Sequence, residues 1–175
     1  MELKIRQERP EDYQEVALLI EDAFKYDPFS DHQEHYLVSR LRQSKDFIAE
    51  LSMVATLNDA VVGHILLTKI TIDTEKESFI SLALAPVSVA PNYQKRGIGA
   101  SLIESAHTKA KALGFNSIVL LGHDSYYPKF GYELTSKYQI EFPFDIPEKY
   151  CMVKELTPNG LEGVHGIVSY PEEFY

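Results

Sequence analysis

Apolar residues recur along the chain with the period of a helix in three segments. The first predicts a core-facing helix over residues 10–25, with Pro10 in the first turn, where helices tolerate proline. The same period predicts helices over 33–41 and 100–114, the last of them ended by Gly114. The apolar members of the first helix are Val16, Leu19, Ile20, Ala23 and Phe24, and those of the last are Leu102, Ile103, Ala106, Ala110 and Leu113.

Other segments carry alternating or β-branched apolar residues, which predicts strands over 3–6, 51–57, 61–72, 79–89 and 117–121. Asn58-Asp59-Ala60 separates two of these strands and predicts a hairpin turn. Pro86 interrupts the fourth strand, and a proline removes a hydrogen-bond donor from a sheet ladder. We therefore expect pairing with the following strand to be lost near Ala85-Pro86. Such a sheet splays open and leaves backbone groups free for a ligand.

The order strand, helix, strand over residues 79–121 is that of a crossover unit, which joins parallel strands. Weaker strand patterns follow near 138–142, 150–156 and 163–169. Together these elements predict an α/β fold with a mixed, splayed central sheet flanked by helices. No repeat, low-complexity tract or linker divides the chain, so we expect a single domain over residues 1–175.

Composition and charge narrow the classes of function. The chain has 175 residues, of which 45% are hydrophobic and 25% charged, as in globular proteins. No run approaches the roughly 18 apolar residues of a membrane span and no targeting signal is visible, so we expect a cytoplasmic protein without a membrane partner. The formal charge of -9 argues against nucleic-acid binding. The lone Cys151 is expected as a small buried hydrophobe, and we expect no metal site.

The segment from Val87 to Ala100 joins the end of a predicted strand to the start of a predicted helix and contains two glycines and two cationic residues. Gly97 and Gly99 allow a ligand to approach the backbone closely, and Lys95 and Arg96 add positive charge. The start of the following helix adds free N–H groups and its positive dipole end. These features predict an anion site suited to a pyrophosphate, although two glycines in such a turn are about as often a structural cap. The segment lacks the spacing of a P-loop or of a Gly-x-Gly-x-x-Gly dinucleotide fingerprint.

These residues resemble the cofactor motif of the GNAT acetyltransferase superfamily, Val-x-Pro-x-x-Gln/Arg-x-x-Gly-x-Gly/Ala. The matching positions are Val89, Pro91, Gln94, Gly97 and Gly99. A second signature of the family, a tyrosine four residues before a Gly-aromatic pair, is matched by Tyr127 with Gly131-Tyr132. The run over residues 121–132 further resembles the bacterial YhbS-like branch.

The resemblance implies an acetyl-CoA site and assigns residues to it. Backbone groups of Val87 and Val89 are expected to pair with the pantetheine arm. The amides expected to hold the pyrophosphate, with the Gln94 side chain nearby, are those of Lys95, Arg96, Gly97, Ile98, Gly99 and Ala100. Tyr127 is expected to be the general acid that protonates the leaving thiolate when an amine attacks the thioester directly in a ternary complex.

The resemblance assigns no general base to deprotonate the amine. Many family members carry an acidic residue on the cofactor strand, but residues 79–90 contain no Asp, Glu or His. We expect His123 first, while Asp124, His64 and Glu34 remain open. The resemblance implies an amine acceptor on a small molecule or peptide, and it leaves a homodimer open. An alternative function is a CoA or acyl-CoA sensor that binds the cofactor without turnover.

Overall fold

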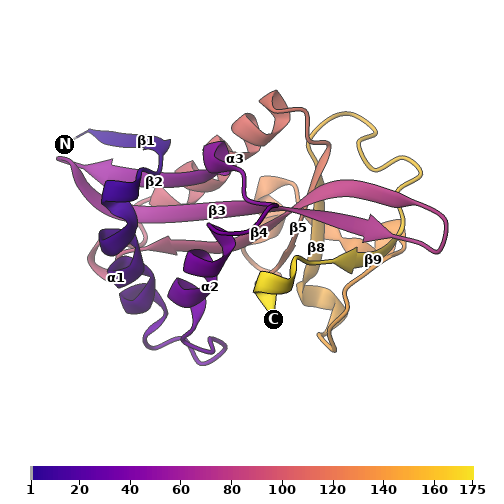
Figure 1. The fold of residues 1–175 in the computed structure, drawn as a ribbon, viewed down its shortest axis with the longest axis horizontal. Coiled ribbons are helices and arrows are strands. Elements are labelled where there is room, and N and C mark those ends of the chain that lie inside the picture. Colours follow the sequence, from indigo (N-terminus) through magenta and orange to yellow (C-terminus); the bar gives the residue numbers. More distant parts are fainter. Residues whose placement is uncertain (1) are drawn as a thin grey trace.

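The computed structural model describes residues 2–175, which contain one sheet of nine strands and three α-helices (Figure 1). The helices are α1 (Tyr13–Phe24), α2 (Glu34–Leu41) and α3 (Ile98–Ala112). The strands are β1 (Leu3–Gln7), β2 (Ser52–Leu57), β3 (Ala60–Asp73), β4 (Ser78–Val89), β5 (Ser117–Leu121), β6 (Glu133–Leu134), β7 (Ile140–Glu141), β8 (Cys151–Glu155) and β9 (Gly166–Ser169). The main strand order is β1-β2-β3-β4-β5-β8-β6, and β9 pairs with β3 and β7. Because β4 and β5 are parallel and their other neighbours antiparallel, the predicted mixed sheet is confirmed.

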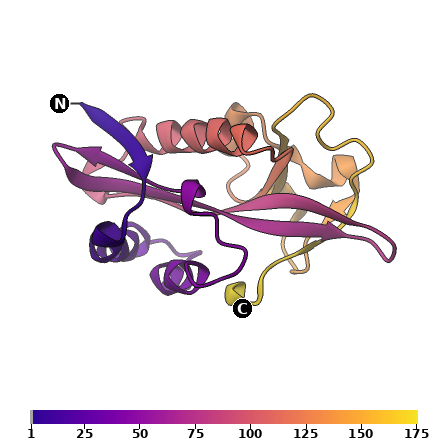
Figure 2. The ribbon, with the colours of Figure 1, turned by 45° about the horizontal axis from the view of Figure 1, so that its top comes forward.

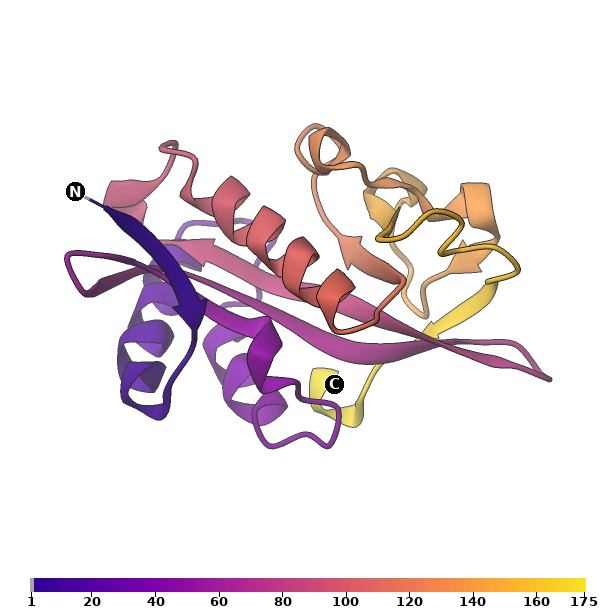
Figure 3. The same cartoon turned by 90° about the horizontal axis from the view of Figure 1, so that it is seen from above.

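The three helices cover opposite faces of this sheet (Figures 2 and 3). Side chains alternate across a strand, so neighbouring residues of β3 contact different helices. Leu66 packs with α1 and α2, whereas Ile65 and Leu67 pack in the larger core beneath α3. The long, paired strands β3 and β4 therefore form the wall between two cores.

Local chemistry explains where the observed elements differ from the predicted ones. Residues 10–12 form a 3₁₀ turn, so α1 begins only at Tyr13. The third helix begins at Ile98, two residues before the predicted start, because the left-handed Gly97 (φ 82°) already turns the chain into it. Gly114 follows that helix at φ 93°, which is the expected conformation of a residue that ends a helix. The predicted hairpin turn is confirmed by positive φ angles at its first two residues.

The sheet splays where Pro86 predicts it. Parallel pairing between β4 and β5 involves two positions, Leu82 with Ile118 and Ala83 with Val119, although both strands continue. The register between β3 and β4 also shifts opposite the Ala85-Pro86 bond, which is cis. Beyond Ala83 one edge of β4 is therefore free of its neighbour. Within residues 2–175, every helix is too short or too polar to cross a bilayer.

Candidate functional site

The free edge of β4 carries unpaired backbone groups at alternate residues. Ala90 donates its N–H to the Val62 carbonyl on β3 at 2.9 Å. Because backbone groups of successive strand residues point in opposite directions, those of Val87 and Val89 face away from β3. The Val89 carbonyl accepts a hydrogen bond from Gln94 Nε2 at 3.0 Å. The Gln94 amide therefore already uses one acceptor position of this edge.

The turn that follows β4 presents amides at the start of α3. The first helical hydrogen bond runs from the Ser101 amide to the Gly97 carbonyl at 3.0 Å. The amides of residues 98–100 precede it and have no acceptor within the helix. Lys95 and Arg96 are exposed beside them, and a side chain on Gly97 would meet nothing within 4 Å, so the approach is open. An anion can reach these donors and the positive end of the helix from solvent.

A cavity of about 660 Å³ lies between the splayed strands; we call it the central cavity. Its walls come from the free part of β4, the end of β5 with the loop after it, the α1–α2 loop and a segment before β8. The lining residues are Phe24, Asp27, Phe29, Leu84, Ala85, Pro86, Val87, Leu121, Gly122, His123, Tyr127, Ile146, Pro147 and Tyr150. The structure thus brings together three of the predicted site residues, Val87, His123 and Tyr127.

Tyr127 begins a 3₁₀ turn (Tyr127–Phe130) and lies half-buried at the wall of the central cavity. Its ring packs against Gly122 so closely that a methyl group there would collide with it. The ring of Tyr132 stands nearly perpendicular to it, with centroids 5.9 Å apart. Burial, with a smaller contribution from Tyr126, raises the pKa of Tyr127 to about 12. The phenol therefore carries its proton at neutral pH.

Tyr126 connects the start of α3 with the central cavity. A Cβ atom on Gly99 would lie 3.3 Å from the Tyr126 hydroxyl, so this hydroxyl sits at the first turn of the helix. The Tyr126 and Tyr127 rings contact each other edge to face, with centroids 5.0 Å apart. Two adjacent tyrosines thus face two different regions, one the anion site and the other the cavity.

His123 and Phe29 face each other across the central cavity. The Phe29 ring meets the imidazole edge-on, at 6.2 Å between centroids and an angle of 74°. The Phe29 amide also donates to Asp27 Oδ1 at 2.8 Å, so the α1–α2 loop brings a carboxylate to the same cavity. This arrangement places an imidazole, a carboxylate and a phenol at the wall of one largely apolar cavity.

Comparison with known proteins identifies this architecture. A family model described as an acetyltransferase (GNAT) domain matches residues 4–135. The chain belongs to this family. It is 34% identical to the uncharacterized N-acetyltransferase YjhQ of Escherichia coli over 133 residues, which cover 74% of each chain. It is also 28% identical to the uncharacterized N-acetyltransferase YhbS of E. coli over 171 residues, or 97% of each chain.

Solved structures of two GNAT proteins resemble this one over nearly the whole chain. A GNAT family acetyltransferase from Brucella melitensis, in complex with acetyl-CoA, has 29% identity and a TM-score of 0.80, and the match covers 99% of both chains. E. coli YhbS, in complex with CoA, has 26% identity and a TM-score of 0.85, covering 98% of this chain and 91% of the other. The predicted family and its YhbS-like branch are therefore confirmed.

Three of the four candidate bases of this GNAT protein do not line the central cavity. His64 is fully buried on β3, where its Nε2 atom lies 3.3 Å from Ser52 Oγ and 3.6 Å from Glu8 Oε1. Burial lowers the pKa of His64 to about 4; Glu8 opposes this shift and Arg42 adds to it. The interpretation of His64 as a cleft residue is therefore wrong, because β3 turns this side chain into the core under α1 and α2.

Glu34 is likewise outside the central cavity. It borders a separate hollow with His32 and residues of α1, and it accepts a hydrogen bond from Ser30 at 2.6 Å. Desolvation raises the pKa of Glu34. Asp124 is exposed and does not line the central cavity. Among the candidate bases named from the sequence, His123 is the one that the fold brings there.

Sequence reasoning missed the far wall of the cavity. Asp27, Tyr150 and the pair Ile146-Pro147 belong to segments that carry no recognisable motif, and Phe24 fits the helical core pattern. The available signal was the aromatic character of the α1–α2 loop, and Phe29 of that loop does line the cavity. Cys151 is buried, as expected, and its thiol faces the Pro147 carbonyl at 3.7 Å.

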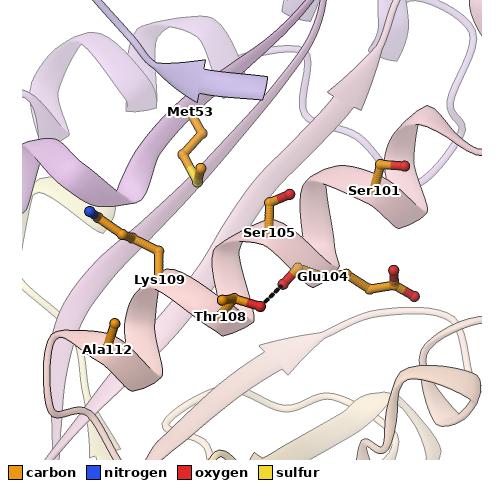
Figure 4. A pocket seen from close by; sticks show the side chains of 7 residues that line it. All are labelled: Met53, Ser101, Glu104, Ser105, Thr108, Lys109 and Ala112. Carbon is orange, nitrogen blue, oxygen red and sulfur yellow. Dashed lines mark hydrogen bonds between the residues drawn. The ribbon is translucent and has the colours of Figure 1, made fainter. Parts of the chain in front are cut away.

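A second hollow lies along the side of α3, next to β2 (Figure 4). It holds about 470 Å³ between Met53 of β2 and a row of α3 side chains. The Thr108 hydroxyl in this row donates to the Glu104 carbonyl of its own helix at 3.1 Å. These residues form an ordinary polar helix face and include none of the predicted site residues.

Proposed function

We propose that this GNAT protein transfers the acetyl group of acetyl-CoA to a primary amine of a small molecule or peptide, and that the amine occupies the central cavity. The observation that carries the proposal is the Tyr126–Tyr127 pair. One hydroxyl lies beside Gly99 in the anion site, and the neighbouring phenol faces the cavity. A site for the phosphates of CoA and a site for an acceptor therefore adjoin each other.

The residues at the start of α3 suit the pyrophosphate of CoA. Free amides of Ile98, Gly99 and Ala100 offer donors without side-chain obstruction, and Lys95 and Arg96 supply charge in a chain that is acidic overall. Val87 and Val89 present the free edge of β4 to the pantetheine arm, whose amides can pair with them. The relatives bound to acetyl-CoA or CoA support the same assignment.

The chemistry then depends on two proton transfers. When bound, acetyl-CoA supplies a thioester carbonyl at which a neutral amine forms a C–N bond while the C–S bond breaks. An amine is mostly protonated at neutral pH, so His123 removes a proton from it directly or through water. Tyr127 donates its proton to the sulfur. Because burial makes Tyr127 a weak acid, its hydrogen bond to the developing thiolate precedes the transfer of the proton.

The proposal is tested by measuring free thiol from acetyl-CoA with a panel of amines, with mass spectrometry of the products. An acetylated amine formed in equal amount to the thiol is the expected result. Calorimetry with CoA is the parallel measurement. CoA binding without thiol release above background across the panel would contradict the enzyme proposal and favour a CoA sensor.

A further inference from the structure

The wall of the central cavity opposite β4 is apolar except at one carboxylate. Phe24, Phe29, Ile146, Pro147 and Tyr150 provide aromatic and aliphatic surface. Among the lining residues, all within 2–175, Asp27 is the one acid, and none is Lys or Arg. An ammonium that enters the cavity therefore finds Asp27 as its one counter-charge among these lining residues.

Asp27 is held in position by the turn that it begins. Its own amide donates to the Phe24 carbonyl at 3.1 Å, and the Ser30 amide donates to the Asp27 carbonyl at 3.3 Å. Side-chain oxygen Oδ1 accepts from the Phe29 amide at 2.8 Å. The second oxygen, Oδ2, accepts no hydrogen bond from the described part of the chain, so it is available to a ligand. The same Phe29 packs against His123, which links the carboxylate to the proposed base.

We propose that the acceptor is a monocationic primary amine on a compact apolar or aromatic body, and that Asp27 selects it by binding its ammonium group. The inference rests on the proposed function and deepens it. The body of such an amine buries against Phe29 and Tyr150, whose rings offer apolar contact, while the Lys149 ammonium already lies 4.9 Å from the Tyr150 ring centroid. After binding, the ammonium gives a proton to His123 and becomes the nucleophile.

The wall also disfavours the other common classes of amine. A polyamine or an aminoglycoside carries several ammonium groups, and only one of them can pair with Asp27. Each further ammonium would lie against apolar side chains without a counter-charge, which costs free energy. An amino acid brings its own carboxylate, which Asp27 repels.

The experiment is calorimetric titration of phenethylamine into the protein, with and without saturating CoA. We expect binding that weakens about tenfold or more in Asp27→Asn, because a hydrogen bond to a charged group is lost. Asp22→Asn is the matched control, since Asp22 is an exposed acid near the end of α1, five residues before Asp27, and does not line the central cavity. We expect its affinity to equal that of the wild type.

Two further ligands isolate the roles of charge and of apolar surface. 2-Phenylethanol keeps the ring without the charge, so we expect Asp27→Asn to leave its affinity unchanged. Spermidine keeps charge without an apolar body, so we expect it to bind more weakly than phenethylamine. If Asp27→Asn fails to fold by circular dichroism, Ile146→Lys provides the test: this half-buried loop position adds a positive charge to the same wall, and we expect phenethylamine binding to be lost.

The outcomes separate this inference from the proposed function. Equal phenethylamine affinity in the wild type and Asp27→Asn, or in the wild type and Ile146→Lys, would overturn the inference, as would tighter binding of spermidine. Thiol release with polyamines but not with phenethylamine would overturn it while leaving the acetyltransferase proposal intact. Asp27-dependent binding without any thiol release would support the amine-binding role of Asp27 and contradict the proposed transfer.

Discussion

The two halves of the site are built in different ways. The proposed donor half lies within one stretch, residues 87–100, and acts mainly through backbone groups at the edge of β4 and the start of α3. The proposed acceptor half is assembled from side chains of four separate segments: the free end of β4, the loop after β5, the α1–α2 loop and residues 146–150. Backbone groups suit a ligand that is the same in every member of a family, because they do not depend on side-chain identity. Loop side chains, in contrast, can be exchanged without disturbing the sheet. The comparison therefore suggests that a common donor is recognised by the fold and a particular acceptor by its loops.

The largest expected effect is on turnover, and it distinguishes the proposed general acid from the CoA site. Tyr127→Phe keeps the ring that packs on Gly122 and removes the proposed proton donor. We expect kcat to fall about 10²-fold or more, because acid–base groups commonly contribute at least this much. CoA affinity measured by calorimetry should stay nearly unchanged.

Tyr126→Phe is the matched control for that variant. Its hydroxyl lies at Gly99, so its removal should affect CoA affinity modestly and leave kcat nearly intact. A kcat loss in Tyr126→Phe as large as that in Tyr127→Phe would show that the two halves are not separable at this pair. Unchanged turnover in Tyr127→Phe would remove it from the acid role.

The next prediction concerns the backbone of the proposed donor half. Gly97→Leu places a bulky side chain at φ 82°, and we expect CoA affinity to fall about tenfold or more as the turn shifts away from this left-handed conformation. Gly114→Leu is a close match, since that glycine has φ 93°, has no neighbour within 4 Å of an added Cβ, and lies just beyond the other end of α3.

Both variants should lose similar stability, about 1–2 kcal/mol in urea unfolding. Only Gly97→Leu should lose CoA affinity. Normal CoA binding by Gly97→Leu, or equal loss in both variants, would argue against a phosphate site at this turn.

A smaller effect is expected for the base. We expect His123→Gln to lower kcat about tenfold at neutral pH, less than Tyr127→Phe, because water can carry the proton in its place. The deficit should shrink as the pH rises toward the pKa of the acceptor amine, since more of the amine is then already deprotonated. A pH–rate profile of both proteins provides the measurement. A deficit that stays constant over the alkaline range would contradict the role of His123 as base.

The smallest effect on activity is expected at the buried His64. His64→Gln should leave the acceptor affinity unchanged and should alter how stability depends on pH. The folded-state pKa of His64, about 4, lies below the ordinary value near 6.5, so the unfolded chain binds its proton first as the pH falls. The stabilising contribution of neutral His64 is therefore fully present above pH 6.5. Between pH 6.5 and pH 4 the free energy of unfolding falls by about 3 kcal/mol as this contribution is lost.

Urea unfolding at pH 7 and pH 5 measures this contribution, and we expect a smaller drop in the variant. His107, whose pKa burial also lowers to about 4, adds a loss of the same sign in both proteins. His165→Gln at an exposed position is the control and should unfold as the wild type does. Equal pH dependence in the His64 variant and the wild type would contradict the neutral buried histidine.

The sequence predicts much of the fold because its signals are local. Periodicity locates α1, α2 and α3 to within about three residues, and Pro86 predicts where β4 parts from β5. The cofactor motif and the downstream tyrosine predict the family, which the comparisons confirm. The exact starts of α1 and α3 were not predictable from apolar spacing, because a 3₁₀ turn and a left-handed glycine decide them.

By itself, the sequence determined the three helices, the long strands, the splay and the glycine turn between β4 and α3, since each depends on residues that are neighbours along the chain. Only the tertiary structure decided which side chains share the central cavity. It placed His123 at the cavity wall, buried His64 beside Glu8, and brought Asp27 and Tyr150 together from opposite ends of the chain. The physical reason is that a strand fixes only which face a side chain points to, whereas the partner on that face depends on how helices and loops pack across the sheet.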